Sequence, residues 1–340
     1  MKTDTVLERL RHWKIKELQF DPFGFCNAKC WFCPVAYKPN PESGKKQMPV
    51  SVMEDIFNQI IEERRPDGIV AQTFNGCYTG HYNEILLYRY FPEFLETLRK
   101  HKLKTMVLTN GMNLIKSRVD LIDTYRDVVN GICINAPCFE KVLFKERTGF
   151  NPDKLDNLVE NIRYAWDQLK WLGKSFSIQI NGVERNSFYS KGGWLDDSRS
   201  PDIRTMTNTQ ELELQYQTAK SLFPEISIFK MPSLIDRAGH LQQLGIISNK
   251  DAIKQHLQKD KTEVVACSNG LQVGGRPFGW LHINANADTF LCCNDYDFDH
   301  VFGNLRENTL REVWLSEKHA QMIQNAFDTI CRSCASSLWG

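Results

Sequence analysis

The chain has 340 residues, of which 42% are hydrophobic and 24% are charged, and its formal net charge is +1. This length exceeds that of one typical hydrophobic core, so we expect one large domain and one smaller domain. The near-neutral charge gives no electrostatic basis for binding nucleic acid or an anionic membrane surface. The charged N-terminal segment 1–20 is not a signal peptide, and no apolar run is long enough to span a bilayer. We therefore expect a soluble, cytoplasmic protein.

Short apolar runs rich in Val, Ile and Phe alternate along the chain with longer amphipathic segments. We predict strands over residues 15–23, 68–75, 105–110, 130–136, 175–182 and 225–232. We predict helices over residues 51–65, 84–102, 113–125, 151–172 and 208–222. Six strand-then-helix units in series are typical of a parallel sheet, and right-handed crossovers curl such a sheet. The sequence therefore predicts an α/β fold, a partial (β/α)6 barrel.

Polar and glycine residues follow the predicted strands. In parallel α/β folds, ligands bind beyond the C-terminal ends of the strands. The residues at those ends are Cys26, Asn75, Gly76, Asn110, Gly111, Asn135, Asn181 and Gly182. Each one alone is also typical of an ordinary turn, but together they predict a ligand-binding mouth.

Three of the eleven cysteines, Cys26, Cys30 and Cys33, lie close together on the loop after the first predicted strand. A reducing cytosol disfavours disulfides, so clustered cysteines there indicate a metal site. Thiolates suit both iron–sulfur clusters and zinc, but zinc in closed sites takes four ligands. Three cysteines without a local fourth ligand favour a cubane cluster with one open iron. A zinc loop and incidental cysteines are the alternatives.

The segment Cys26-Asn27-Ala28-Lys29-Cys30-Trp31-Phe32-Cys33 resembles the signature of the radical S-adenosylmethionine superfamily. The likeness includes the aromatic residue before the third cysteine and the six strand–helix units that follow. It implies a [4Fe-4S] cluster that binds S-adenosylmethionine through its open iron. It also implies reductive cleavage to a 5′-deoxyadenosyl radical, hydrogen abstraction from a substrate, and a ferredoxin- or flavodoxin-type electron donor.

The resemblance further implies contacts to S-adenosylmethionine. Phe32 would contact the adenine. The segment 73–77 loosely matches the family's glycine motif after the second strand, which would place Asn75 and Gly76 at the methionine amine, although the usual Gly-Gly-Glu run is absent. The other implied cofactor contacts, at strand ends and in an Arg-Thr-Gly run, are Thr109, Asn110, Asn135 and Arg147.

The pattern changes after residue 236, so we expect a barrel domain over 1–236 and a small cysteine-rich α+β domain over 237–340. The second segment contains a hairpin-like alternation over 280–293 and a final helix over 308–326. Its order of cysteines resembles the auxiliary-cluster domains called SPASM, with two clusters, and Twitch, with one. Five cysteines suit a single auxiliary [4Fe-4S] cluster, and the implied ligands are Cys267, Cys292, Cys331 and Cys334. Cys293 is the substitute for its neighbour, because adjacent strand residues face opposite sides, and zinc is the alternative metal.

These features predict a radical S-adenosylmethionine oxidoreductase that abstracts hydrogen from a small polar substrate, such as a sugar or an aminocyclitol. The auxiliary cluster would take the second electron, which gives net oxidation of a carbinol to a ketone. The sequence identifies no catalytic base. One alternative is a peptide-modifying maturase that forms thioether crosslinks, epimerises or oxidises side chains. An alternative of another class is a zinc-stapled, non-catalytic binding protein.

Overall fold

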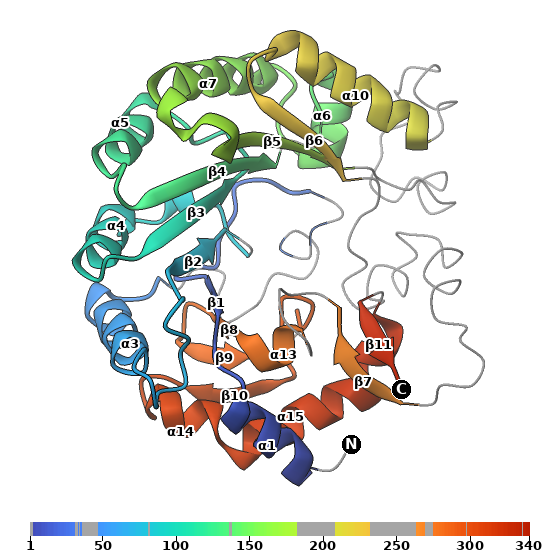
Figure 1. Ribbon diagram of the computed structural model, residues 1–340. Helices are drawn as coiled ribbons and strands as arrows, with labels where there is room; N and C mark the ends of the chain where they lie inside the picture. Colours follow the sequence, from blue (N-terminus) through green and yellow to red (C-terminus); the bar gives the residue numbers. More distant parts are fainter. Residues whose placement is uncertain are drawn as a thin grey trace.

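The computed structural model describes residues 3–30, 33, 35, 47–80, 82–135, 138–181, 208–231, 263–268, 275–296, 298–334 and 336–340. A curved sheet of nine strands forms its centre, with strand order β10-β9-β8-β1-β2-β3-β4-β5-β6, and helices cover its outer face (Figure 1). A second sheet pairs β11 with β7. Among the described residues, no helix is long and apolar enough to cross a membrane.

Six parallel strands form the N-terminal part of the sheet, and this confirms the predicted partial barrel. They are β1 (Glu17–Phe20), β2 (Gly76–Thr79), β3 (Lys104–Thr109), β4 (Val129–Asn135), β5 (Phe176–Asn181) and β6 (Ser227–Met231). Four successive residues of β4, from Gly131 to Ile134, are buried, as expected of a strand that is covered on both faces. All these strands point their C-terminal ends toward the same edge of the sheet.

The connecting helices bury one apolar face each against this sheet. They are α1 (Thr3–His12), α3 (Val50–Glu62), α4 (Phe91–Lys100), α5 (Lys116–Thr124), α6 (Lys141–Thr148), α7 (Lys154–Gln168) and α10 (Asn208–Leu222), with 3₁₀ turns η1 (Ile85–Leu87) and η2 (Lys170–Ser175). In α3 the buried residues Met53, Ile56, Phe57 and Ile60 recur at helical spacing. The Phe57 ring lies 5.1 Å from that of Phe20 on β1, so α3 packs directly on the strand that leads to the cysteine loop.

The C-terminal segment extends the same sheet from the free edge of β1. It consists of β7 (Val264–Cys267), α13 (Arg276–Gly279), β8 (Trp280–Ile283), β9 (Asp288–Phe290), β10 (Val301–Asn304), α14 (Leu310–Trp314), α15 (Glu317–Asp328), η3 (Ile330–Ser333) and β11 (Ser337–Trp339). Strand β8 pairs with β1 in parallel, with Leu18 opposite Leu281, and α15 lies beside α1 (Figure 1). The C-terminal cysteines are thereby held close to the barrel mouth.

The predicted second strand, 68–75, is wrong. Within it, Val70 makes only an isolated bridge to Ile15, and the strand that joins the sheet is β2, which begins at Gly76, directly after the predicted range. The apolar side chains Ile69, Val70 and Phe74 are buried, but in a loop rather than a strand. Hydrophobicity marked the burial of this segment and could not distinguish a buried loop from a buried strand.

Two predicted helices are shorter or broken. The helix predicted over 84–102 begins at Phe91, because Pro92 occupies its first turn and residues 85–87 form a 3₁₀ turn. The helix predicted over 308–326 is two helices, α14 and α15. Ser316 ends the continuity because its hydroxyl accepts a hydrogen bond from the His319 amide and caps α15.

Candidate functional site

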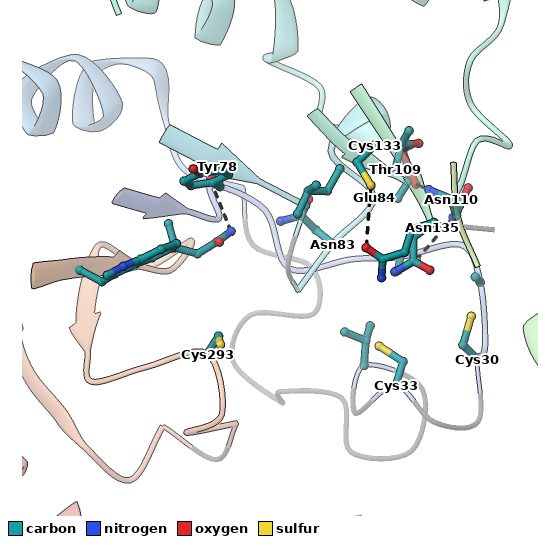
Figure 2. Close-up of a pocket in the computed structure, with 18 of the residues that line it drawn as sticks. Cys30, Cys33, Tyr78, Asn83, Glu84, Thr109, Asn110, Cys133, Asn135 and Cys293 are labelled. Carbon is teal, nitrogen blue, oxygen red and sulfur yellow. Dashed lines mark hydrogen bonds between the residues drawn. The ribbon is translucent and has the colours of Figure 1, made fainter. Parts of the chain in front are cut away.

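A cavity of about 350 Å³ lies at the C-terminal ends of the parallel strands (Figure 2). Cys26, Cys30 and Cys33 line one part of its wall, on the loop that follows β1. Strands β1 to β5 with the loops that follow them, and the C-terminal segment, line the rest. Their lining residues are Gln19, Tyr78, Gly80, Asn83, Glu84, Thr109, Asn110, Cys133, Asn135, Gln179, Arg276, Trp280 and Cys293. The cysteine loop, the barrel and the C-terminal segment therefore share one cavity.

The three cysteines of the loop influence one another electrostatically. Burial is the main cause that raises the pKa of Cys26 to about 12 and that of Cys30 well above its usual range. Cys33 raises the pKa of both further, Glu84 adds to the rise at Cys26, and Cys26 adds to the rise at Cys30. A bound metal centre supplies the positive charge that the thiolate ligand form needs here.

The spacing of these thiols also bears on the kind of metal centre. Within the described residues, no three His, Cys, Asp or Glu side chains converge on a position for a single ion. The ligands of a cubane bind separate iron corners and so stand farther apart than the ligands of one ion. Three partly buried thiols on one loop line a shared cavity, where they could bind separate iron corners of a cubane.

Glu84 joins the ends of two strands to the cysteine loop. Its carboxylate oxygens accept hydrogen bonds from the Thr109 hydroxyl at 2.7 Å and from the Asn110 amide at 2.8 Å. The Asn110 side chain in turn donates to Asn27 Oδ1 at 2.9 Å and reaches the Sγ of Cys26 at 3.8 Å. Burial raises the pKa of Glu84 to about 7. This network positions the cysteine loop against the end of β3.

Glu84 is not among the site residues predicted from the sequence, because the second strand was predicted too early in the chain. The loop that follows the true β2 runs from Gly80 to Glu84, so a glycine and a glutamate do occupy the position where the family motif was sought. Gly80 has a φ of +84°, and a Cβ there would lie 2.2 Å from the carbonyl oxygen of Leu108. Only glycine fits this turn.

The predicted cofactor-binding residues divide into three groups. Thr109, Asn110 and Asn135 lie on the cavity wall, and Asn135 accepts a hydrogen bond from Asn181 at 2.7 Å. Asn75 and Gly76 do not lie at the mouth. They lie at the start of β2 and line a separate hollow of about 270 Å³ at the opposite strand ends. The prediction that they follow a strand toward the cofactor is therefore wrong.

Arg147 and Phe32 complete this set. Arg147 is buried and ion-paired with Glu211 of α10, and it also donates to the Asn181 carbonyl at 3.4 Å. It pairs with a carboxylate of the chain itself rather than with one in the cavity, so its predicted cofactor contact is not found. Phe32 lies outside the described residues.

The four predicted auxiliary ligands interact electrostatically. The repulsion of Cys334 and Cys267 adds to burial in raising the pKa of Cys331. Cys293 and Cys331 in turn add to burial in raising the pKa of Cys292. The Asn294 amide donates to Cys292 Sγ at 3.3 Å, and its side chain donates to Cys334 Sγ at 3.7 Å. The thiols come from β7, from the end of the hairpin, from η3 and from the residue that follows η3. The four together remain the predicted ligand set of an auxiliary cluster.

Cys293 points away from this group. Its thiol lines the cavity and accepts a hydrogen bond from Arg276 Nη1 at 2.7 Å, while its carbonyl accepts one from the Tyr82 hydroxyl at 2.7 Å. Figure 2 shows it on the C-terminal segment, across from Cys30 and Cys33. The vicinal cysteines therefore face two different sites.

Two family models match the chain. Residues 21–182 match the radical SAM superfamily, and residues 275–335 match SPASM, an iron–sulfur cluster-binding domain. The first match implies S-adenosylmethionine and a [4Fe-4S] cluster as cofactors, and the second implies auxiliary iron–sulfur binding. No curated protein sequence matches the chain.

Solved structures share the fold. BtrN in complex with AdoMet and 2-DOIA superposes with a TM-score of 0.51 at 12% identity, over 92% of this chain and 87% of BtrN. Streptococcus suis SuiB bound to S-adenosylmethionine gives a TM-score of 0.54 at 16% identity, over 94% and 71% of the two chains. Native anSMEcpe with bound AdoMet gives 0.52 at 14% identity, over 94% and 88%. The chain belongs to the radical SAM superfamily and carries a SPASM-type iron–sulfur domain at its C-terminal end.

Proposed function

We propose that this enzyme oxidises a small polar substrate in the cavity by hydrogen abstraction followed by removal of a second electron toward the auxiliary site. When bound, the cofactors supply the radical chemistry: one-electron cleavage of S-adenosylmethionine gives the 5′-deoxyadenosyl radical, and the auxiliary cluster is the acceptor of the second electron. For a carbinol, loss of the C–H hydrogen atom, one electron and the hydroxyl proton leaves a ketone.

The observation that carries this proposal is the pair Cys292–Cys293. Cys293 lines the cavity that the loop cysteines also line, while Cys292 belongs to the group of four auxiliary thiols. A substrate radical formed in the cavity is therefore separated from the auxiliary site by a single pair of adjacent residues. A short distance between the substrate radical and the auxiliary site favours electron transfer, whereas a purely structural metal site does not require it.

The residues of the chain bind and orient rather than perform the redox step. Cys26, Cys30 and Cys33 would hold the first cluster, and Cys267, Cys292, Cys331 and Cys334 would hold the auxiliary one. Thr109, Asn110 and Asn135 offer hydroxyl and amide groups at the strand ends, where they would hold S-adenosylmethionine.

The share of each relative's chain that this chain covers supports a small substrate. BtrN, whose structure contains the small molecule 2-DOIA, is covered over 87% of its length. SuiB, which has been solved with the precursor peptide SuiA, is covered over 72% in that complex. Peptide modification is thus the second candidate. The electron for the first step would come from a ferredoxin- or flavodoxin-type donor.

The first test is anaerobic reconstitution followed by reduction with dithionite in the presence of S-adenosylmethionine. We expect 5′-deoxyadenosine by liquid chromatography and mass spectrometry, and its loss in Cys26→Ala. Cys77→Ala is the matched control, because Cys77 is a buried thiol outside the cavity. Continued formation of 5′-deoxyadenosine in Cys26→Ala would refute the assignment of the loop.

The second test separates oxidation from the other reactions. Small polyols, 2-DOIA and synthetic peptides are incubated with the enzyme in deuterated water. Oxidation gives a product with two hydrogens fewer than the substrate, whereas epimerisation keeps the elemental composition and places a solvent deuterium on the reacting carbon. Turnover of peptides alone, or a product of unchanged composition with deuterium on the reacting carbon, would replace the proposed oxidation with the second candidate.

A further inference from the structure

Arg276 places a cation on the cavity wall opposite the cysteine loop. It is the first residue of α13, and its Nη1 donates to Cys293 Sγ at 2.7 Å. Its guanidinium lies over the ring of Trp280, 4.3 Å from the ring centroid. All three side chains line the cavity. This corner of the cavity consists of a planar cation, an aromatic face and a thiol.

The chain holds this arginine in a fixed position. Gly275, directly before it, has a φ of +71°, and a Cβ there would lie 2.1 Å from the carbonyl oxygen of Cys267. The Trp280 ring is stacked on Tyr78, with centroids 5.5 Å apart and an angle of 16° between the planes. Arg276 therefore rests on an aromatic platform that is anchored in β2 and β8, so its hydrogen-bonding edge has a defined direction.

Two N–H donors in this corner have no acceptor among the described residues. Nε of Arg276 and Nε1 of Trp280 are buried, and neither meets an acceptor among the described residues. Glu17, which stands opposite Trp280 in the strand register, hydrogen-bonds to Tyr78 instead. No carboxylate within the described part of the chain forms an ion pair with Arg276. A partly buried cation whose protein partner is a thiol lacks an anion.

The geometry of the guanidinium indicates which anion fits. Nη1 is engaged with Cys293, which leaves the edge formed by Nε and Nη2. This edge presents two parallel N–H donors in one plane, and a carboxylate matches them with its two oxygens. The stacked Trp280 ring restricts approach to that plane.

We propose that Arg276 binds a carboxylate group of the substrate, with Trp280 supporting the guanidinium and Cys293 fixing its orientation. This inference rests on the proposed function, since it takes the cavity as the place where the substrate reacts. It narrows the substrate class to small polar molecules that carry a carboxylate. It also places that carboxylate beside Cys293, at the end of the cavity nearest the auxiliary thiols.

The test uses Cys293 as a reporter and needs no knowledge of the substrate. The enzyme with both clusters reconstituted is treated anaerobically with iodoacetate or with iodoacetamide, and alkylation of each cysteine is followed by mass spectrometry. Iodoacetate carries a carboxylate where iodoacetamide carries a neutral amide, and the two reagents are otherwise alike. The ratio of their rates on one thiol cancels the intrinsic reactivity of that thiol. Cys133 is the internal control, because it lines the same cavity and its thiol faces Gln179 rather than a cation.

We expect the ratio of iodoacetate to iodoacetamide rates to be about tenfold higher at Cys293 than at Cys133, because a partly buried charge pair is weakly screened. In Arg276→Gln the two ratios should become equal, and in Arg276→Lys, which keeps the charge but loses the fork, the ratio at Cys293 should be intermediate. Equal ratios in the unmodified enzyme would overturn the proposal, as would a preference that persists in Arg276→Gln. Failure of iodoacetate to reach Cys293 would overturn it too, because the subsite must admit a carboxylate. Formation of 5′-deoxyadenosine is measured separately, so loss of the proposed function and loss of this subsite are distinguishable.

Discussion

Glu84 and Thr109 join the ends of β2 and β3 through a hydrogen bond of 2.7 Å from the threonine hydroxyl to the carboxylate. Both side chains are buried, at 1% and 3% exposure. The second oxygen of Glu84 accepts the amide of Asn110, whose side chain reaches Cys26. A buried carboxyl group on the cavity wall thus links the end of β3 to the cysteine loop.

Glu84 should make the stability of the protein depend on pH. Burial raises the pKa of this carboxyl group from 4.5 to about 7. Its contribution to stability is therefore fully present below pH 4.5 and is lost as the pH rises through about 7. The loss amounts to about 3 kcal/mol, and in Glu84→Gln this part of the pH dependence should vanish. Urea unfolding at pH values across this window measures it.

The matched control for this change is Glu213→Gln, because Glu213 is an exposed glutamate whose pKa is lowered by Lys230. That variant should keep the fall in unfolding free energy between mildly acidic and neutral pH. An unchanged slope in Glu84→Gln would contradict the role given to Glu84.

Asn110 should tune the electronic properties of the first cluster. Its side-chain amide lies 3.8 Å from Cys26 Sγ, and hydrogen bonds to ligand sulfurs stabilise the reduced, more negative state. Asn110→Ala should therefore lower the midpoint potential of this cluster by on the order of tens of millivolts. A redox titration followed by electron paramagnetic resonance in the Cys292→Ala background isolates the signal. Asn161→Ala, which removes an amide that bonds to Met112 away from the cysteines, should leave the potential unchanged.

The parts of this site that were predictable from sequence are those with a local signature. The spacing of Cys26, Cys30 and Cys33 and the apolar strands β3, β4 and β5 carry strong patterns within a few residues. Strand β2, Gly-Cys-Tyr-Thr, has a glycine at its start and only four residues. The run before it is more apolar, so the sequence pattern predicted the strand there instead. The misplaced strand then moved Asn75 and Gly76 to the wrong end of the sheet and left Glu84 unassigned.

Other features depend on tertiary contacts that no local pattern encodes. Arg147 was predicted to contact the cofactor, but it pairs with Glu211, which lies 64 positions away on α10. Which of Cys292 and Cys293 belongs to the auxiliary group depends on the direction of the chain where β9 ends. The two residues are identical, so the sequence alone does not distinguish them. Arg276 was not predicted at all, because a lone arginine in a glycine-rich loop gives no signal until β8 pairs with β1.

Arg147 should contribute to stability rather than to cofactor binding. Its ion pair with Glu211 is almost fully buried, with side-chain exposures of 5% and 1%. Arg147→Met leaves an uncompensated buried carboxylate, which costs about 3–5 kcal/mol. Lys116→Met breaks the exposed pair with Asp120 and should cost less than about 1 kcal/mol. Unfolding free energies distinguish the two. A large rise in the Kd for S-adenosylmethionine without loss of stability would restore the role that the sequence suggested.

Substitution of Cys292 and substitution of Cys293 should have different effects on the metal content of the protein. The thiol of Cys292 belongs to the auxiliary group with Cys331, while that of Cys293 meets Arg276 in the cavity. The unmodified chain should hold about eight irons after reconstitution, as two cubanes require. Cys292→Ala should lose about half of them and still form 5′-deoxyadenosine, because the loop cysteines are intact. Cys293→Ala should retain all the iron and sulfide. Iron loss in Cys293→Ala with full retention in Cys292→Ala would exchange the two assignments, and it would also remove the thiol that links the substrate cavity to the auxiliary site.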